Sequence, residues 1–233
     1  MISIIIPAYN EENKIGELIA YLRSHSHASE AEIIVVDGGS SDQTVKEANN
    51  AGAMVVTSPK KGRAKQMNFG ASKASGELLY FLHADTRPSK TFIKDIQAEV
   101  NAGYEAGCFR LKFDNPHKAL TFYSWFTQFD LDVLRFGDQS LFVTKTLFNK
   151  IGGFDEDLLV MEDQVIVTEL KECAQFSIIQ KPVITSARKY EFIGFLKLQV
   201  IFFCILAMYY AGLSQEALAH FYQTNLRTEF SDK

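Results

Sequence analysis

One segment limits the choice of fold more than any other. Between Glu77 and Asp85 the chain runs through an almost unbroken series of apolar and aromatic side chains and then ends in a carboxylate. A short, continuous apolar run is typical of a strand that is buried on both faces, as in the sheet of an α/β protein. Ligands of open α/β sheets bind beyond the carboxyl ends of the strands. The segment therefore predicts a buried strand that holds Asp85 at a ligand-binding edge.

The N-terminal half alternates between strand-like and helix-like patterns. Apolar residues recur at helical spacing between four expected strands, which lie at 3–7, 32–37, 53–57 and 77–83. Such alternation indicates right-handed crossovers and a mostly parallel sheet. Asn10 is predicted to cap the first helix. The second half is less regular, with strands expected at 107–113, 140–144 and 176–180 and helices at 117–132 and 162–174.

Composition narrows the class of protein. The chain has 233 residues, of which 47% are hydrophobic and 22% charged, so a packed core is expected rather than disorder. A net charge of −4 argues against a general nucleic-acid binder. The three cysteines show no disulfide or metal spacing, and Met1–Ile6 lacks the features of a signal peptide. We therefore expect a cytoplasmic protein with reduced thiols.

Polar residues follow three of the expected strands. They form the segments Pro7-Ala8-Tyr9-Asn10-Glu11, Asp37-Gly38-Gly39-Ser40 and His83-Ala84-Asp85. Each segment alone is explained by a turn or a helix cap. In a parallel sheet, however, all three meet at one edge, which indicates a binding site.

Several side chains near this edge suit the binding of a diphosphate. Asp85 is a hard oxygen ligand for Mg²⁺ or Mn²⁺. His83 is a second metal ligand, a hydrogen-bond donor to a phosphate, or an ordinary histidine with its hydrogen bonds satisfied. Arg63 and Lys65 can neutralise phosphates or simply form a solvated helix start. Glu162-Asp163 can supply a general base, although an acidic first helical turn also explains that pair.

These motifs resemble one enzyme family across residues 1–190. The chain is similar to the inverting nucleotide-sugar glycosyltransferases of family 2, which have the GT-A fold, and most similar to a bacterial subgroup of unassigned substrate. The matching segments include Ser3–Glu11, Ile33–Asp42, Gly62–Ala64 with Asn68–Ala71, Phe81–Asp85, Gly152–Asp155 and Met161–Asp163. The resemblance implies a Rossmann-like, mostly parallel mixed sheet flanked by helices. We expect the GT-A domain at 1–190 and an apolar helical extension at 191–233.

The resemblance also implies roles for individual residues. Asp85 corresponds to the last aspartate of the metal-binding Asp-X-Asp motif, and Asp163, with Glu162 beside it, corresponds to the base that deprotonates the acceptor. The nucleotide site is expected to include Pro7, Ala8, Tyr9, Glu11, Asp37, Gly38, Arg63, Lys65, Asn68, His83 and Ala84. Gly38 and His83 stand where the family usually carries aspartates. Asp138, Gln139 and Arg188 are candidates for the acceptor side, with a structural ion pair as the alternative for Arg188.

The last apolar segment leaves three alternatives open. Residues 192–213 are long enough to span a bilayer, but Lys197 and Gln199 interrupt the N-terminal end of the segment. The segment is therefore a core or oligomer-interface helix, a helix lying in the membrane surface, or a true span. An oligomer-interface helix implies a homo-oligomer. A helix lying in the membrane surface implies peripheral contact with the inner face of the cell membrane.

The sequence thus predicts transfer of a single sugar, since the Gln-X-X-Arg-Trp element of processive synthases is absent. The resemblance implies a UDP- or GDP-linked donor, a divalent metal and an acceptor of unknown structure, with lipid-linked molecules among the candidates. A catalytically inactive nucleotide-sugar or glycan binding module is the alternative, because of Gly38 and His83. A nucleotidyltransferase is disfavoured, since Pro7-Ala8-Tyr9-Asn10 is not a Gly-rich basic loop.

Overall fold

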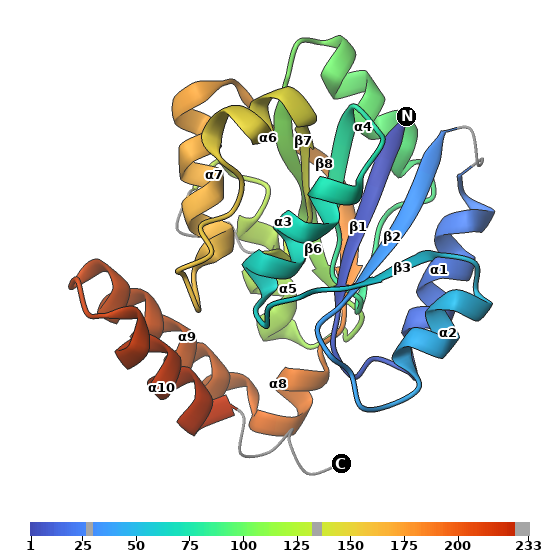
Figure 1. Cartoon of the computed structure of the whole chain (residues 1–233). Helices are drawn as coiled ribbons and strands as arrows, with labels where there is room; N and C mark the ends of the chain where they lie inside the picture. The colour runs from blue at the N-terminus through green and yellow to red at the C-terminus, as the bar shows by residue number, and fades with distance from the viewer. Residues whose placement is uncertain (27–29, 132–136, 227–233) are drawn as a thin grey trace.

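Strand β1 (Ile2–Ala8) lies inside a sheet of eight strands, and its sequence explains why. Ile4 and Ile6 pack into one apolar core and Ile5 into a second core on the opposite face. Consecutive side chains of a strand point to opposite faces, so an unbroken apolar run requires helices on both sides of the sheet. Figure 1 shows this layered arrangement in the computed structural model, which describes residues 1–26, 30–131 and 137–226.

The N-terminal half forms the parallel part of the sheet. The strand order is β3-β2-β1-β4-β7-β6-β8-β5. β1 pairs in parallel with β2 (Ala31–Asp37) and β4 (Leu78–Phe81), and β2 pairs in parallel with β3 (Met54–Thr57). The right-handed alternation predicted from the sequence therefore places the carboxyl ends of β1, β2 and β4 at one edge.

The second half adds mixed pairing. β7 (Leu141–Thr144) runs antiparallel to both β4 and β6 (Ala106–Phe113). β8 (Phe176–Thr185) lies parallel to β6 and antiparallel to the short β5 (Thr86–Arg87). The predicted mostly parallel, mixed sheet is confirmed.

Helices cover both faces, each through an apolar stripe. Residues Leu18, Ile19 and Leu22 of the first helix, for example, are buried at helical spacing against one face. The helices on that face are α1 (Ile15–Ser24), α2 (Thr44–Asn50), α4 (Phe92–Asn101) and α5 (Lys118–Phe126). The opposite face is covered by α3 (Arg63–Lys73), α6 (Lys145–Ile151) and α7 (Glu162–Cys173).

Three helices follow the last strand. They are α8 (Arg188–Ile193), α9 (Phe195–Tyr210) and α10 (Gln215–Leu226), and α9 and α10 lie side by side in Figure 1. α9 buries Leu198, Ile201 and Ile205 against the first core. Its outward face is also apolar, with Leu196, Val200 and Phe203 between 60% and 78% exposed.

The alternative of a true membrane span at 192–213 is not borne out. α9 has 16 residues, whereas a helix needs about 20 to cross the hydrocarbon core. Within the described ranges, no helix combines the length and apolar character that a bilayer crossing requires.

The expected cap of the first helix is wrong. α1 begins at Ile15 rather than after Asn10, and Asn10 instead adopts a left-handed backbone with φ of 54°. Asparagine tolerates this region, and its side-chain oxygen accepts a hydrogen bond from the Ser41 N–H at 2.9 Å. Asn10 therefore ties two loops together.

Three element boundaries also differ from expectation. The strand predicted at 77–83 ends at Phe81, where its pairing with β7 also ends, and β8 continues to Thr185 instead of 180. The helix expected at 117–132 ends at Phe126, and its last expected residue lies outside the described residues.

Candidate active site

The strand ends converge as the topology predicts. Ala8 pairs with Asp37 across β1 and β2, and the Leu82 N–H donates to the Ile5 carbonyl at 3.0 Å where β4 ends. The amide of Gln66, in α3, donates to the carbonyls of Ala8 at 3.0 Å and Val36 at 2.8 Å. Gln66 was not predicted from the sequence, because its partners are the backbone carbonyls of two distant strands.

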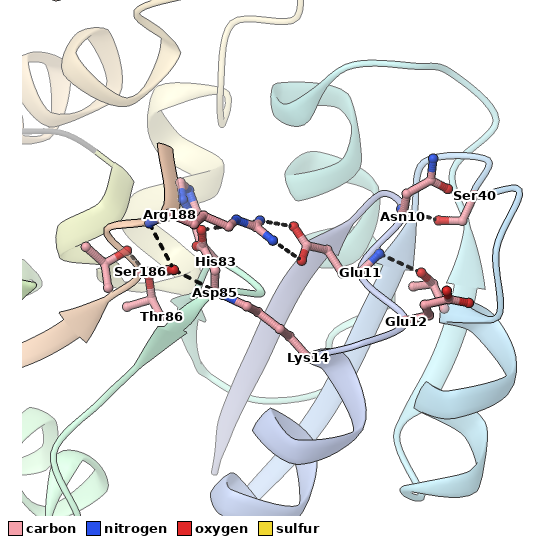
Figure 2. A network of polar contacts seen from close by, with 12 residues as sticks. Asn10, Glu11, Glu12, Lys14, Ser40, His83, Asp85, Thr86, Ser186 and Arg188 are labelled. Atoms are coloured by element: carbon pink, nitrogen blue, oxygen red, sulfur yellow. Dashed lines mark hydrogen bonds and ion pairs between the residues drawn. The ribbon is translucent and has the colours of Figure 1, made fainter. Parts of the chain in front are cut away.

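The first two loops are bonded to each other and form one wall of the site. The Asp37 carboxylate is 3% exposed and accepts hydrogen bonds from the N–H groups of Gly39 at 3.0 Å and Ser40 at 3.1 Å. The Ser40 hydroxyl in turn accepts from the Asn10 N–H at 3.0 Å (Figure 2). Asp37 thus shapes its own loop, and its predicted contact with the base stays a prediction.

Asp85 faces a half-buried guanidinium. Arg188, the first residue of α8, forms a two-pronged ion pair with Glu11, with Nη1 3.1 Å from Oε2. Its Nη2 also lies 3.5 Å from Asp85 Oδ2 (Figure 2). Burial disfavours the charged guanidinium, but the hydrogen bond to Glu11 and the nearby carboxylates outweigh it and raise the pKa of Arg188. Arg188 therefore stands beside two predicted donor-site residues.

The loop that carries Asp85 is fixed through its backbone. The Ser186 N–H donates to the Asp85 carbonyl at 3.2 Å, and Lys14 Nζ donates to the Ser186 hydroxyl at 3.0 Å. The Asp85 side chain remains 16% exposed. Its carboxylate therefore stays available at the edge of the sheet.

Asp85 fits a metal that arrives together with a diphosphate. Among the residues that the structure describes, no group of three or more histidine, cysteine or acidic side chains could hold an ion by itself. Mg²⁺ typically binds through one or two carboxylates and the oxygens of a substrate phosphate. One partly open carboxylate matches that pattern.

A second set of charged groups lies at the N-terminus of α7. Arg63 Nη1 lies 3.3 Å from Glu162 Oε1 and 3.4 Å from Asp163 Oδ2. Burial raises the pKa of Glu162, which is 6% exposed, and the charge of Asp163 adds to this, although Arg63 opposes both effects. Arg63, which was predicted to lie near the phosphates, is thus ion-paired with both carboxylates at the start of α7.

His83 lies beside the second set of charges. Its Nδ1 lies 3.2 Å from Asp138 Oδ1, in the 3-10 helix η2 (Gly137–Gln139). A methyl group added to Gly137 would lie 2.2 Å from Asp163 Oδ2 and 2.7 Å from His83 Nε2, so His83 and Asp163 border the same point. Although burial opposes it, the His83 hydrogen bond holds the pKa of the Asp138 carboxyl well below its usual range.

The remaining predicted residues lie around these groups. Asn68 bonds the backbone of Phe154 with both atoms of its amide, at 2.8 and 2.9 Å, and so anchors a loop. Gln139 is buried and lines a cavity of about 20 Å³ together with Asp163. Tyr9 is 54% exposed, while Pro7 and Lys65 are half-buried and Ala84 is buried. All of these roles stay predictions.

The loops around the site also contain strained backbone conformations. Among the described residues other than glycine, positive φ occurs at Asn10, Ser140 and Met161, with values of 54°, 58° and 72°. Asn10 follows β1, Ser140 follows η2, and Met161 precedes Glu162. Such conformations cost about 1–3 kcal/mol each and cluster at functional sites.

Comparison with known proteins decides the family. A model described as glycosyl transferase family 2 matches residues 3–153, which is more than half of the chain. The chain belongs to this family. The predicted family and GT-A fold are therefore confirmed.

Solved structures share the fold of this chain. The mannosyltransferase PcManGT from Pyrobaculum calidifontis, in complex with GDP-Man and Mn²⁺, matches with a TM-score of 0.70 and 16% identity, over 96% of this chain and 70% of that one. TarS of S. aureus in complex with UDP matches with a TM-score of 0.65 and 22% identity, over 99% and 72%.

A curated relative is a longer protein that this chain matches only in part. The probable glycosyltransferase YdaM of Bacillus subtilis is 24% identical over 191 residues, which cover 71% of this chain and 46% of the relative. The chain thus spans less than half of that protein.

Proposed function

We propose that the protein transfers a single sugar from a nucleoside diphosphate sugar to an acceptor hydroxyl with inversion of configuration. The observation that carries the proposal is that two carboxylates lie near His83. Asp85 lies two residues beyond it at the edge of the sheet, and Asp163 borders the same point as its ring. Asp85 suits the leaving diphosphate, and Asp163 suits the attacking acceptor hydroxyl.

Asp163 is the proposed general base. The acceptor O–H transfers its proton to the Asp163 carboxylate while the acceptor oxygen bonds to the anomeric carbon. The bond from that carbon to the diphosphate oxygen breaks, and the nucleoside diphosphate leaves with the electron pair. Arg63 holds the Asp163 carboxylate in position from one side.

The donor is proposed to lie over the ends of β1, β2 and β4. Asp85 would hold a divalent ion, which when bound offsets the negative charge that develops on the diphosphate. The complexes of PcManGT with GDP-Man and Mn²⁺ and of TarS with UDP support this choice of donor class and metal. Arg188 is near enough to Asp85 to contact the same diphosphate.

A donor screen tests the proposal. UDP-glucose, UDP-GlcNAc and GDP-mannose would be incubated with the full chain and Mn²⁺, Mg²⁺ or EDTA, and nucleotide release would be measured. We expect release from at least one donor, and we expect EDTA, Asp85→Asn and Asp163→Asn each to reduce it about 100-fold or more. Metal-dependent nucleotide binding without release from any donor would instead identify the alternative, an inactive binding module.

A second surface bears on membrane contact and assembly. The outward faces of α9 and of the end of α8 are apolar, with Phe192 56%, Leu196 78% and Phe203 70% exposed. This face supports the predicted contact of 192–213 with a membrane surface or with a second copy of the chain. Flotation with vesicles and sedimentation of the free protein would distinguish the two.

A further inference from the structure

The loop that leads into the proposed base is anchored near both of its ends. This α6–α7 loop covers residues 152–161 and is followed directly by the helix that carries Asp163. Near its start, the Asn68 amide donates to the Phe154 carbonyl at 2.8 Å and accepts from the Phe154 N–H at 2.9 Å. The other end of the loop extends toward α9 and α10 in Figure 1.

The second anchor comes from α10. Gln215 Oε1 accepts hydrogen bonds from the N–H groups of Leu159 at 3.2 Å and Val160 at 3.4 Å. Gln215 is the first residue of α10, and the Ser214 hydroxyl caps this helix by accepting from the Ala217 N–H at 3.3 Å. A side chain at a fixed helix start thus holds two consecutive backbone groups of the α6–α7 loop.

These bonds end immediately before a strained residue. Met161 follows Val160 and has a φ of 72°, a left-handed conformation that is costly for methionine and persists only where the surroundings enforce it. The Met161 carbonyl accepts from the N–H groups of Gln164 and Val165, both at 3.1 Å. The first turn of α7 is therefore built on Met161, and relaxation of this residue would turn Asp163 away from its present position.

We propose that Gln215 is a positioning residue for Asp163. By holding the end of the α6–α7 loop, Gln215 keeps Met161 in its strained conformation and the Asp163 carboxylate in the site. This inference rests on the proposed function, in which Asp163 is the general base. It gives a part in the reaction to α10, which lies beyond the family match at residues 3–153.

Two substitutions at position 215 separate this role from a general packing role. Gln215→Leu removes the accepting oxygen and keeps a side chain that suits a helix. Gln215→Glu retains a side-chain oxygen that accepts from the same two N–H groups. Gln223→Leu, at an exposed position of the same helix, is the matched control. All variants are made in the full chain.

The experiment combines hydrogen exchange with kinetics, using the donor that the screen identifies. We expect Gln215→Leu to exchange amide hydrogens about tenfold faster in residues 155–161, because two hydrogen bonds are lost. Its kcat for nucleotide release should fall about tenfold or more, since a general base acts only within hydrogen-bond reach of the acceptor.

The other properties should not change. The KM for the donor and the Kd for UDP with Mn²⁺ should stay within about twofold of wild type, and the Tm within about 4 °C. Gln215→Glu should recover most of the kcat and of the protection from exchange, and Gln223→Leu should match wild type in every measurement.

Three results would overturn the inference. They are a wild-type kcat in Gln215→Leu, a loss of kcat that Gln215→Glu does not recover, and a loss that is accompanied by unfolding of the variant. Faster exchange without a loss of kcat would likewise refute only this inference. A wild type that releases no nucleotide from any donor would refute the proposed function instead.

Discussion

Gly137→Ala is the sharpest perturbation of the catalytic geometry. The added methyl group would lie 2.2 Å from Asp163 Oδ2 and 2.7 Å from His83 Nε2, whereas ordinary contacts begin near 3.4 Å. Both atoms are the ends of side chains, so they can move, and the Asp163 carboxylate must retreat by about 1 Å. A misplacement of that size can lower the rate about 100-fold.

The same substitution should leave the fold intact. Gly137 is absent from the glycines with positive φ, so alanine fits its backbone, and replacing glycine at a compatible position stabilises by about 0.4–1 kcal/mol through the unfolded state. We therefore expect nucleotide release to fall about 100-fold while the Tm does not fall and the Kd for UDP with Mn²⁺ stays unchanged.

Gly16→Ala is the matched control. Its methyl group would meet only the Glu47 carbonyl at 3.9 Å and the Glu47 carboxylate at 4.0 Å, within ordinary contact range. Thermal unfolding and nucleotide release would be measured for both variants. Wild-type turnover in Gly137→Ala would refute the assignment of Asp163 as the base at this point.

Three further outcomes are expected. Gly70→Ala should lower the free energy of unfolding by about 1–3 kcal/mol, because its methyl group would lie 2.5 Å from Ile5 Cγ2 and push α3 off the sheet. An unchanged midpoint of urea unfolding would contradict this. The pKa of Glu162 is raised above 4.5 in the folded state, so the stability linked to this group is present below pH 4.5 and is lost as the pH rises through the raised pKa. Glu162→Gln should remove that part of the pH dependence of unfolding, and an unaltered profile would argue against it. Phe203→Glu, at 70% exposure, should change the free energy of unfolding by less than about 0.5 kcal/mol and abolish vesicle flotation or self-association, whereas Ile201→Glu, at 4% exposure, should unfold the chain.

Local patterns predicted the parts of the fold that local physics determines. The apolar runs of β1, β2 and β4 could only be strands buried on both faces, and their order along the chain brought Ala8, Asp37 and Asp85 to one edge. The acidic pair at the start of α7 was likewise readable from position. Tertiary contacts overrode local preference at Asn10, because its amide found Ser41 across the site rather than the helix that follows.

The contacts that complete the site could not be read in advance. Gln66 and Gly137 act through residues far away in sequence, and nothing in their neighbourhood distinguishes them from ordinary helix and loop positions. The same holds for Arg188, whose partner Glu11 lies 177 residues earlier. Such pairs depend on how elements pack, which a single sequence does not display.

The pairing of Arg188 with Glu11 has a consequence for the order of folding. Closing a loop of 177 residues is entropically costly, and contacts of this separation form late because local structure must be in place first. Residues 3–153, which carry the family match, include Asp85 and Glu11 but neither Asp163 nor Arg188. During synthesis the parallel part of the sheet, β1 to β4, can therefore assemble before the site does, and competence for transfer is acquired only when α7, β8 and α8 have emerged and docked.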